Sequence, residues 1–295
     1  MSCHAGLRSF RLTEAELAAL PVLGIAGNFA EHLSQAGEAS DFVNIATESE
    51  NAPKGLFPIY LPGFSNFLGV YPLSHHVVAA DFTQQPRLQI EPELAVLFAV
   101  TYDEHGWVES LTPQAFTAFN DCSNRINAPK ISLKKNWGSA STGISQDWFE
   151  LDELSEQGCL QDYVIACSLV RAGLVTAYGQ TTPVKHYSYW NQALLDWLIN
   201  QLKSQRDQGP LEDMRAILAQ LAQPKQLIIS LGATRYTAFG EACYLQPGDQ
   251  LHIGILPLSL AEQGQWMSAN ARETLLEQGG ICLMQQVRQL DSNKD

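Results

Sequence analysis

The chain has 295 residues, of which 45% are hydrophobic, and a formal net charge of −13. It is long enough for one large domain or two small ones. The acidic balance argues against nucleic-acid binding, which needs clustered Lys and Arg. No stretch approaches the roughly 18 apolar residues of a membrane span, and the first residues lack a signal-peptide pattern. The scattered cysteines form no CxxC pair, which is typical of reduced thiols in the cytoplasm.

The first elements expected along the chain are short. Residues 1–20 should form a tail and a short helix, with Thr13 as its N-cap. Residues 22–28 read as a strand that runs into a turn, and a short helical stretch follows to residue 35. Residues 37–54 lack periodicity and are expected to form an exposed loop.

The rest of the chain favours strands with a few inserted helices. Apolar runs of strand length are found at residues 57–61, 76–80, 91–102, 163–173, 226–231, 250–255 and 280–286. Helical spacing of apolar residues covers 190–205, and a second helix is expected near 211–221. These elements predict a β-rich α+β fold. Because there is no repeat or flexible linker, one main domain is expected over residues 21–295.

Two glutamates stand at the head of the predicted strand 91–102. Glu91 and Glu93 lie two residues apart, so their side chains point to the same face of a strand. Asp121 follows further along the chain and could join them in an all-oxygen site for Mg²⁺ or Mn²⁺, with Ca²⁺ as an alternative. Paired acids at a strand edge are also common on solvated surfaces. The apolar strand that follows favours the cation site, because buried acids need a cation.

Four further residues have both a functional and a structural interpretation. Arg125 would hold the carboxylates in place, or form an ordinary ion pair. Lys134 would bind an anionic substrate or stabilise an enolate, or be a solvated loop residue. The small residues before Thr234 would let a ligand approach the backbone. His32, on a short helix beside the loop, would reach a site when this segment closes, or would be structural.

In this order, the motifs resemble those of the fumarylacetoacetate hydrolase superfamily. The string from Gly27 to His32 is similar to the family's G-x-N-Y-x-x-H element, with Asn28 and with Phe29 in place of tyrosine. Glu91 and Glu93 match its E-x-E pair, and Asp121, Ser123 and Arg125 match its D-x-S-x-R string. Lys134 stands nine residues before Gly143, as in the family's lysine loop, and 231–234 resemble its T-G-T-P strand.

The resemblance implies a mixed β-roll or β-sandwich, usually a homodimer, with Mg²⁺ or Mn²⁺ bound by Glu91, Glu93 and Asp121. It implies hydrolysis of a C–C bond in a small anionic 2-oxo or diketo acid. His32 would be the general base and Lys134 would share the enolate charge. Arg125, Thr234 and Asn28 would contact the substrate. A mobile lid is expected near residues 27–55.

Two departures from the family pattern leave other functions open. Gln35 stands where hydrolytic relatives have a glutamate that orients the histidine, and Leu61 replaces a lysine. Gln35 can still hold the imidazole ring by a hydrogen bond, and Glu31 or Glu38 would be substitutes. Decarboxylation or tautomerisation needs no water-activating pair and tolerates Gln35. A metal-binding or regulatory protein without catalysis is the third alternative.

Overall fold

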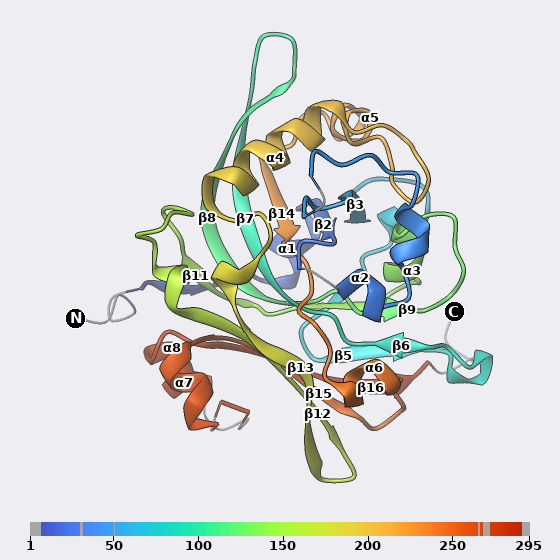
Figure 1. Cartoon of the computed structure of the whole chain (residues 1–295), viewed down its shortest axis with the longest axis vertical. Helices are drawn as coiled ribbons and strands as arrows, with labels where there is room; N and C mark the ends of the chain where they lie inside the picture. Colours follow the sequence, from blue (N-terminus) through green and yellow to red (C-terminus); the bar gives the residue numbers. More distant parts are fainter. Residues whose placement is uncertain (1–6, 30–31, 50, 265, 268–271, 291–295) are drawn as a thin grey trace.

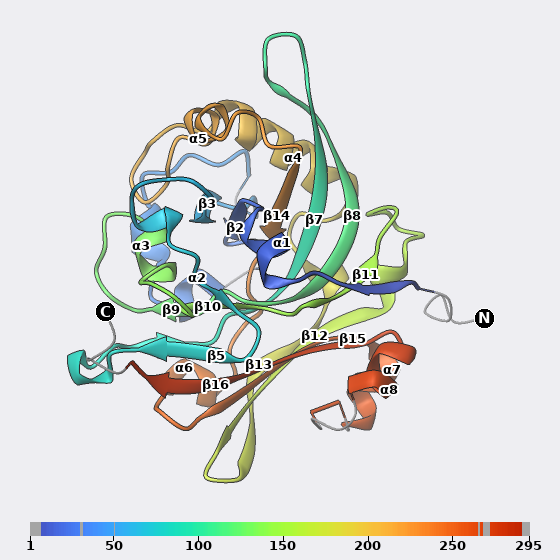
Figure 2. The same cartoon turned by 180° about the vertical axis from the view of Figure 1, so that it is seen from behind.

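The computed structural model describes residues 7–29, 32–49, 51–264, 266–267 and 272–290. Two large β-sheets pack against each other, and helices lie at their outer sides (Figures 1 and 2). The predicted β-rich α+β fold is therefore confirmed. Within the described ranges, no helix has the length and apolar character needed to cross a membrane.

The large sheet contains nine strands, seven of which follow the order β1-β11-β8-β7-β14-β2-β3. Their bounds are Ser9–Arg11 (β1), Asp147–Glu150 (β11), Val108–Asn120 (β8), Pro92–Tyr102 (β7), Gln226–Ser230 (β14), Val22–Ala26 (β2) and Gly55–Tyr60 (β3). The other two strands, which pair beside this path, are Leu73–Ser74 (β4) and Thr142–Ile144 (β10).

The second sheet follows the order β13-β12-β15-β16-β5. Its strands are Leu174–Pro183 (β13), Tyr163–Arg171 (β12), Gln250–Pro257 (β15), Ile281–Gln289 (β16) and Val77–Ala80 (β5). A small ladder joins Leu88–Gln89 (β6) to Ser123–Asn124 (β9).

The helices are short except for one. They are Glu14–Ala18 (α1), His32–Gln35 (α2), Ser132–Lys135 (α3), Asn191–Ser204 (α4), Met214–Gln220 (α5), Ala238–Ala242 (α6), Leu258–Gln263 (α7) and Arg272–Glu277 (α8), with a 3₁₀ turn at Ala39–Phe42 (η1). α4 and α5 lie over the large sheet, and α7 and α8 flank the second one (Figure 1).

Most of the predicted elements are present. Thr13 caps α1 through a capping box with Glu16, and α4 and α5 lie close to the expected ranges. The sequence analysis missed β8, β13, β10 and β11, and also α6, α7 and α8. Within the segment predicted as a tail and helix, β1 pairs with β11. Residues 1–6 of that segment, and Ala30 and Glu31 of the histidine motif, lie outside the described residues.

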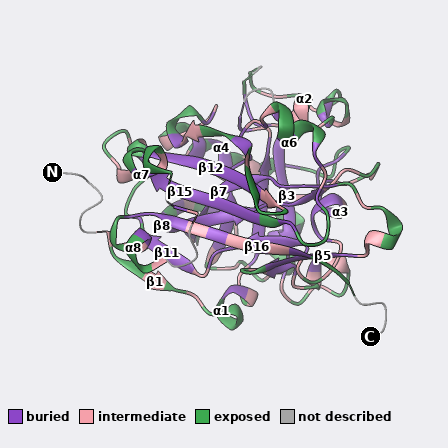
Figure 3. Ribbon diagram, turned by 90° about the horizontal axis from the view of Figure 1, so that it is seen from below, coloured by how far each residue is buried: buried purple, intermediate pink, exposed green. Residues whose placement is uncertain are grey.

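The hydrophobic core lies between the two sheets, where the strands are buried (Figure 3). Phe116 on β8 contacts Tyr163 on β12 edge to face, with ring centroids 5.3 Å apart. Such pairs add about 1 kcal/mol beyond the burial of their area. The packing fixes the end of β8 against the second sheet.

One buried amide pair also joins the sheets. Asn120, at the end of β8, donates to Gln285 Oε1 on β16 at 2.8 Å. The Gln285 Nε2 atom donates to the carbonyls of Ser74 and Val77. The Asn120 Oδ1 atom accepts from the backbone N–H of Glu91 at 3.2 Å. Gln285 thus supports the backbone of the first predicted metal ligand.

We expect Gln285→Met to lower the free energy of unfolding by about 3 kcal/mol, because it leaves buried polar groups without partners. Denaturant unfolding measures the effect. Gln286→Met is the matched control. In the described ranges the Gln286 side chain bonds to Arg288 alone, so this variant should change stability by less than about 1 kcal/mol. Equal losses in the two variants would contradict this account.

The first residue of α3, Ser132, is held by the carboxyl group of Glu212, whose pKa is raised. The Ser132 hydroxyl donates to Glu212 Oε1, and Glu212 Oε2 is buried with no hydrogen-bond partner in the part of the chain that the structure describes. Burial raises the pKa of Glu212 from 4.5 to about 7. Because the folded state favours the protonated form, this contribution to stability is complete below pH ~4.5 and is lost as the pH rises to ~7.

The natural protein should therefore lose about 2 kcal/mol of unfolding free energy between pH 4.5 and 7, and Glu212→Gln should not show this loss. The variant should be more stable than the natural protein at pH 8 and equally stable at pH 4. Thermal or urea unfolding across this pH range tests the expectation. A variant that is less stable at pH 8 would show that the ionised carboxylate is needed.

Candidate metal centre

Three acidic residues come together where β7 begins and β8 ends. The antiparallel register pairs Pro92 with Asn120, and the N–H of Asp121 donates to the carbonyl of Glu91 at 2.9 Å. One carboxylate oxygen from each of Glu91, Glu93 and Asp121 lies within 4.8 Å of the others. All three side chains are buried. The hairpin thus explains how acids separated in sequence share one site.

Glu93 is held from the end of β14. Its Oε2 atom accepts hydrogen bonds from the Ser230 hydroxyl and, at 2.8 Å, from the N–H of Gly232. Gly232 has φ +111°, and a Cβ there would lie 3.1 Å from the Asn28 side chain. Only glycine readily adopts this backbone conformation. The small residues predicted to allow close approach therefore orient a carboxylate.

The lysine beside these acids is Lys135, the residue after the predicted one. Lys135 Nζ lies 2.5 Å from Glu91 Oε2 and 2.6 Å from Asp121 Oδ2. Lys134, which was predicted to act here, instead contacts Glu38 at 3.3 Å and Asp41 at 2.7 Å. The placement of Lys134 beside the triad is corrected to Lys135, because consecutive residues of a helix point about 100° apart.

Arg125 connects several side chains at the same place. It donates to Glu91 at 2.5 Å and to Glu38 at 2.9 Å. It also donates to the Tyr236 hydroxyl at 2.7 Å and to Gln89 at 2.8 Å. Its guanidinium therefore holds Glu91, as the sequence predicts for a residue that orients the carboxylates.

The three carboxylates have very different pKa values. Burial opposes ionisation of Glu91, yet Lys135 and Arg125 hold its pKa well below the usual value. Burial, with Asp121 and Glu91 nearby, raises the pKa of Glu93 well above its usual value. Burial raises the pKa of Asp121 to about 7 despite Lys135. The protein alone thus disfavours three simultaneous negative charges here.

His32 on α2 lies beside this cluster, with Nε2 3.6 Å from Glu91 Oε1. Neither ring nitrogen has a hydrogen-bond partner among the described residues. Gln35, expected to hold the histidine, instead exchanges two hydrogen bonds with the backbone of Tyr236. The ring of Tyr236 packs against His32 with centroids 5.2 Å apart. The prediction that Gln35 bonds His32 is therefore wrong; Gln35 anchors α2.

Two residues predicted to contact the substrate, Asn28 and Thr234, are placed differently from the expectation. Asn28 lines the small cavity at the acids, but its amide bonds to Leu231 and Tyr189 backbone atoms. The Thr234 hydroxyl is buried and has no hydrogen-bond partner among the residues described, and it lies 3.2 Å from where a Cβ of Gly179 would be. Ala233 lines the cavity instead. Thr234 thus faces β13 rather than the acids.

The sequence analysis missed several site residues. Tyr236 follows the small-residue stretch closely, but one aromatic residue carries no specific signal. Ser230 ends a predicted strand. Glu38 was considered only as a substitute partner of His32; it lies in a segment read as an exposed loop, yet it is buried and pairs with Arg125 and Lys134. Lys135 directly follows the predicted Lys134, and the spacing in the sequence cannot tell which of the two faces the acids.

The donor set fits a divalent cation. The acids line a cavity of about 20 Å³, which holds one water-sized group. Neither oxygen of Asp121 meets hydrogen-bond geometry, although one lies 2.6 Å from Lys135. Five carboxylates (Glu38, Asp41, Glu91, Glu93 and Asp121) face three cationic side chains in the cluster. One divalent cation would balance this charge, and carboxylate oxygens suit Mg²⁺ or Mn²⁺.

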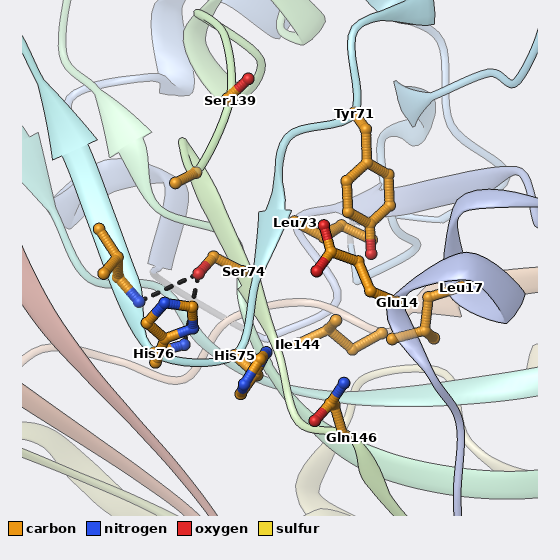
Figure 4. A pocket seen from close by; sticks show the side chains of 12 residues that line it. Glu14, Leu17, Tyr71, Leu73, Ser74, His75, His76, Ser139, Ile144 and Gln146 are labelled. Carbon is orange, nitrogen blue, oxygen red and sulfur yellow. Dashed lines mark hydrogen bonds between the residues drawn. The ribbon is translucent and has the colours of Figure 1, made fainter. Parts of the chain in front are cut away.

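A separate cavity of about 490 Å³ lies between α1, β4 and β10. Figure 4 shows Glu14, Tyr71, His75 and His76 around it, with the Ser74 hydroxyl accepting backbone hydrogen bonds from His76 and Val77. It shares no lining residue with the acid cavity. The charged side chains converge at the cavity of the acids and not at this larger cavity.

Lys135→Met should distinguish an ion-pair cluster from a cation site. Without metal, we expect the free energy of unfolding to fall by about 3 kcal/mol, because two buried carboxylates lose their partner. Mn²⁺ should then stabilise the variant more than the natural protein, since it replaces the missing charge. Thermal unfolding with and without Mn²⁺ measures both effects. Lys185→Met, at an exposed lysine, is the control, and a weaker Mn²⁺ response in Lys135→Met would contradict the expectation.

The fold resembles that of several solved structures over most of the chain. A comparison with curated proteins finds no match. A solved structure of 2-keto-3-deoxyarabinonate dehydratase superposes with a TM-score of 0.51 at 14% identity, covering 92% of this chain and 75% of that one. An uncharacterised protein from Mycobacterium abscessus gives a TM-score of 0.50 at 12% identity, covering 92% and 79%.

A 5-carboxymethyl-2-hydroxymuconate delta-isomerase from Mycobacterium smegmatis gives 0.49 at 12% identity, covering 92% of this chain and 80% of that one. Residues 38–287 match a protein family described as a family of unknown function, DUF5718. The resemblance to the fumarylacetoacetate hydrolase superfamily is confirmed by the shared fold. The chain belongs to the DUF5718 family and is a divergent protein with the fumarylacetoacetate hydrolase fold.

Proposed function

We propose that the protein is a divalent-metal-dependent enzyme that cleaves a C–C bond in a small 2-oxo or diketo acid. The observation that carries the proposal is the group of three buried carboxylates within 4.8 Å of one another, with His32 and Lys135 lining the same cavity. Glu91, Glu93 and Asp121 would hold Mg²⁺ or Mn²⁺, as in the sequence-based prediction.

The residues around the acids suit formation of an enolate. A bound divalent cation would supply a Lewis acid for the carbonyl and enolate oxygens. Lys135 would share the developing negative charge, in place of Lys134. His32, whose ring nitrogens have no hydrogen-bond partner in the described part of the chain, would accept a proton from the attacking water and return it to the leaving carbon. The burial of the acids and of His32 would keep bulk water away from the reacting groups.

Decarboxylation or tautomerisation of a related acid is the second candidate. Gln35 bonds to the backbone of Tyr236 and supplies His32 with no negative partner. A reaction without an activated water tolerates that arrangement. The two candidates share the metal ligands and differ in whether His32 is needed as a base toward water.

The cellular setting remains a prediction. The cytoplasm follows from the cysteine pattern, and a homodimer follows from the family resemblance. A small anionic keto acid is the proposed partner, while the negative net charge of the chain disfavours nucleic acid.

Incubation with Mn²⁺ and an acylpyruvate or oxaloacetate tests the proposal through the loss of enol absorbance. Hydrolysis should yield two acids, and His32→Gln should slow it by about 100-fold while keeping the Mn²⁺-dependent rise in melting temperature. Glu93→Gln should lose both the activity and the rise in melting temperature.

Release of CO₂ without a new pair of acids would favour the second candidate. If His32→Gln hydrolyses the substrate as fast as the natural protein, His32 is not the general base. If Mn²⁺ does not raise the melting temperature of the natural protein, the metal site itself is wrong.

A further inference from the structure

Glu38 occupies an unusual position between two cavities. It lines the cavity of about 20 Å³ at the acids and also a polar cavity of about 490 Å³ on the outer side. The inner space is too small for a keto acid, since it holds one water-sized group. A keto acid would therefore need more room than the acids leave here. Glu38, in the segment from α2 to η1, is the residue that lines both cavities.

This segment is held by its own carboxylates. Glu38 Oε1 accepts from Arg125 at 2.9 Å and from Lys134 at 3.3 Å. Asp41 Oδ2 accepts from Lys134 at 2.7 Å. Glu38, Arg125 and Lys134 are all at most 7% exposed in their side chains. Arg125 and Lys134 thus already bind one buried carboxylate, and it comes from the chain itself.

Arg125 and Lys134 also lie next to the proposed metal ligands. One Arg125 guanidinium bridges Glu38 and Glu91, at 2.9 and 2.5 Å. A molecule only a few carbon atoms long could reach from the acid cavity to the position of the Glu38 carboxylate. Arginine and lysine donors bind carboxylates strongly in such dry surroundings.

We propose that Arg125 and Lys134 form a carboxylate-binding subsite, that Glu38 fills it in this conformation, and that an acidic group at the far end of the substrate displaces Glu38. Lys134 is then a specificity-determining residue rather than part of the metal centre. This inference rests on the proposed function and assigns its substrate a second acidic group. Glu38 acts as an internal competitor, which lowers the apparent affinity for that group.

Comparing the binding of two ligands isolates the contribution of the second acidic group. 2-Oxoglutarate and 2-oxovalerate share the 2-oxo acid end and the chain length, and only the former has a second carboxylate. Their dissociation constants are measured by isothermal titration, with and without Mn²⁺. We expect the natural protein to prefer 2-oxoglutarate, and Glu38→Gln to increase this preference about tenfold because the competitor is gone.

Lys134→Met should remove most of the preference, about tenfold or more for a lost charge-assisted hydrogen bond, and should leave 2-oxovalerate binding unchanged. Glu48→Gln and Lys185→Met are the matched controls, since both residues are exposed and Glu48 accepts one hydrogen bond, from Asn200, among the residues that the structure describes. Both controls should behave as the natural protein.

Equal affinities for the two ligands in the natural protein, with and without Mn²⁺, would overturn the subsite. So would a preference that survives Lys134→Met, or a weaker preference in Glu38→Gln, which would make Glu38 only a neutralising partner. Failure of Mn²⁺ to bind would instead overturn the proposed function. A diacid preference that needs no Mn²⁺ and disappears in Lys134→Met would still support the subsite.

Discussion

The ion pairs of Lys135 with Glu91 and Asp121 are the constraint on which the rest of the site depends. Three carboxylates buried together repel one another, and none can stay ionised at low cost without a cation nearby. In the structure the ammonium group of α3 and the guanidinium of Arg125 supply part of that charge. The remaining negative charge makes a divalent cation the natural partner of the cluster.

The surrounding fold keeps these groups in place. The β7–β8 hairpin sets the acids side by side, and the Asn120–Gln285 pair fixes the hairpin end against the second sheet. The backbone of Gly232 and the hydroxyl of Ser230 orient Glu93. These supports come from three distant parts of the chain, which is typical of a site built on rigid elements rather than on one loop.

Much of the fold and the acid triad could be predicted from the sequence, because the E-x-E spacing and the apolar run after it are local signals. β8 was missed because Pro113 and several polar residues interrupt its apolar pattern, and the structure accommodates Pro113 at a register shift against β7. Glu38 was read as part of a loop because its ionic partners, Arg125 and Lys134, lie far from it in the sequence. Long-range pairs of this kind leave no periodicity in the sequence.

The choice between Lys134 and Lys135 illustrates the same limit, since spacing to a glycine cannot tell which of two neighbours faces the acids. The most direct test of the central claim is anomalous scattering from crystals soaked in Mn²⁺. We expect a peak between Glu91, Glu93 and Asp121, at about 2.1–2.2 Å from oxygen atoms of all three. An empty centre, with Lys135 still bound to Glu91 and Asp121 at high Mn²⁺ concentration, would contradict the account.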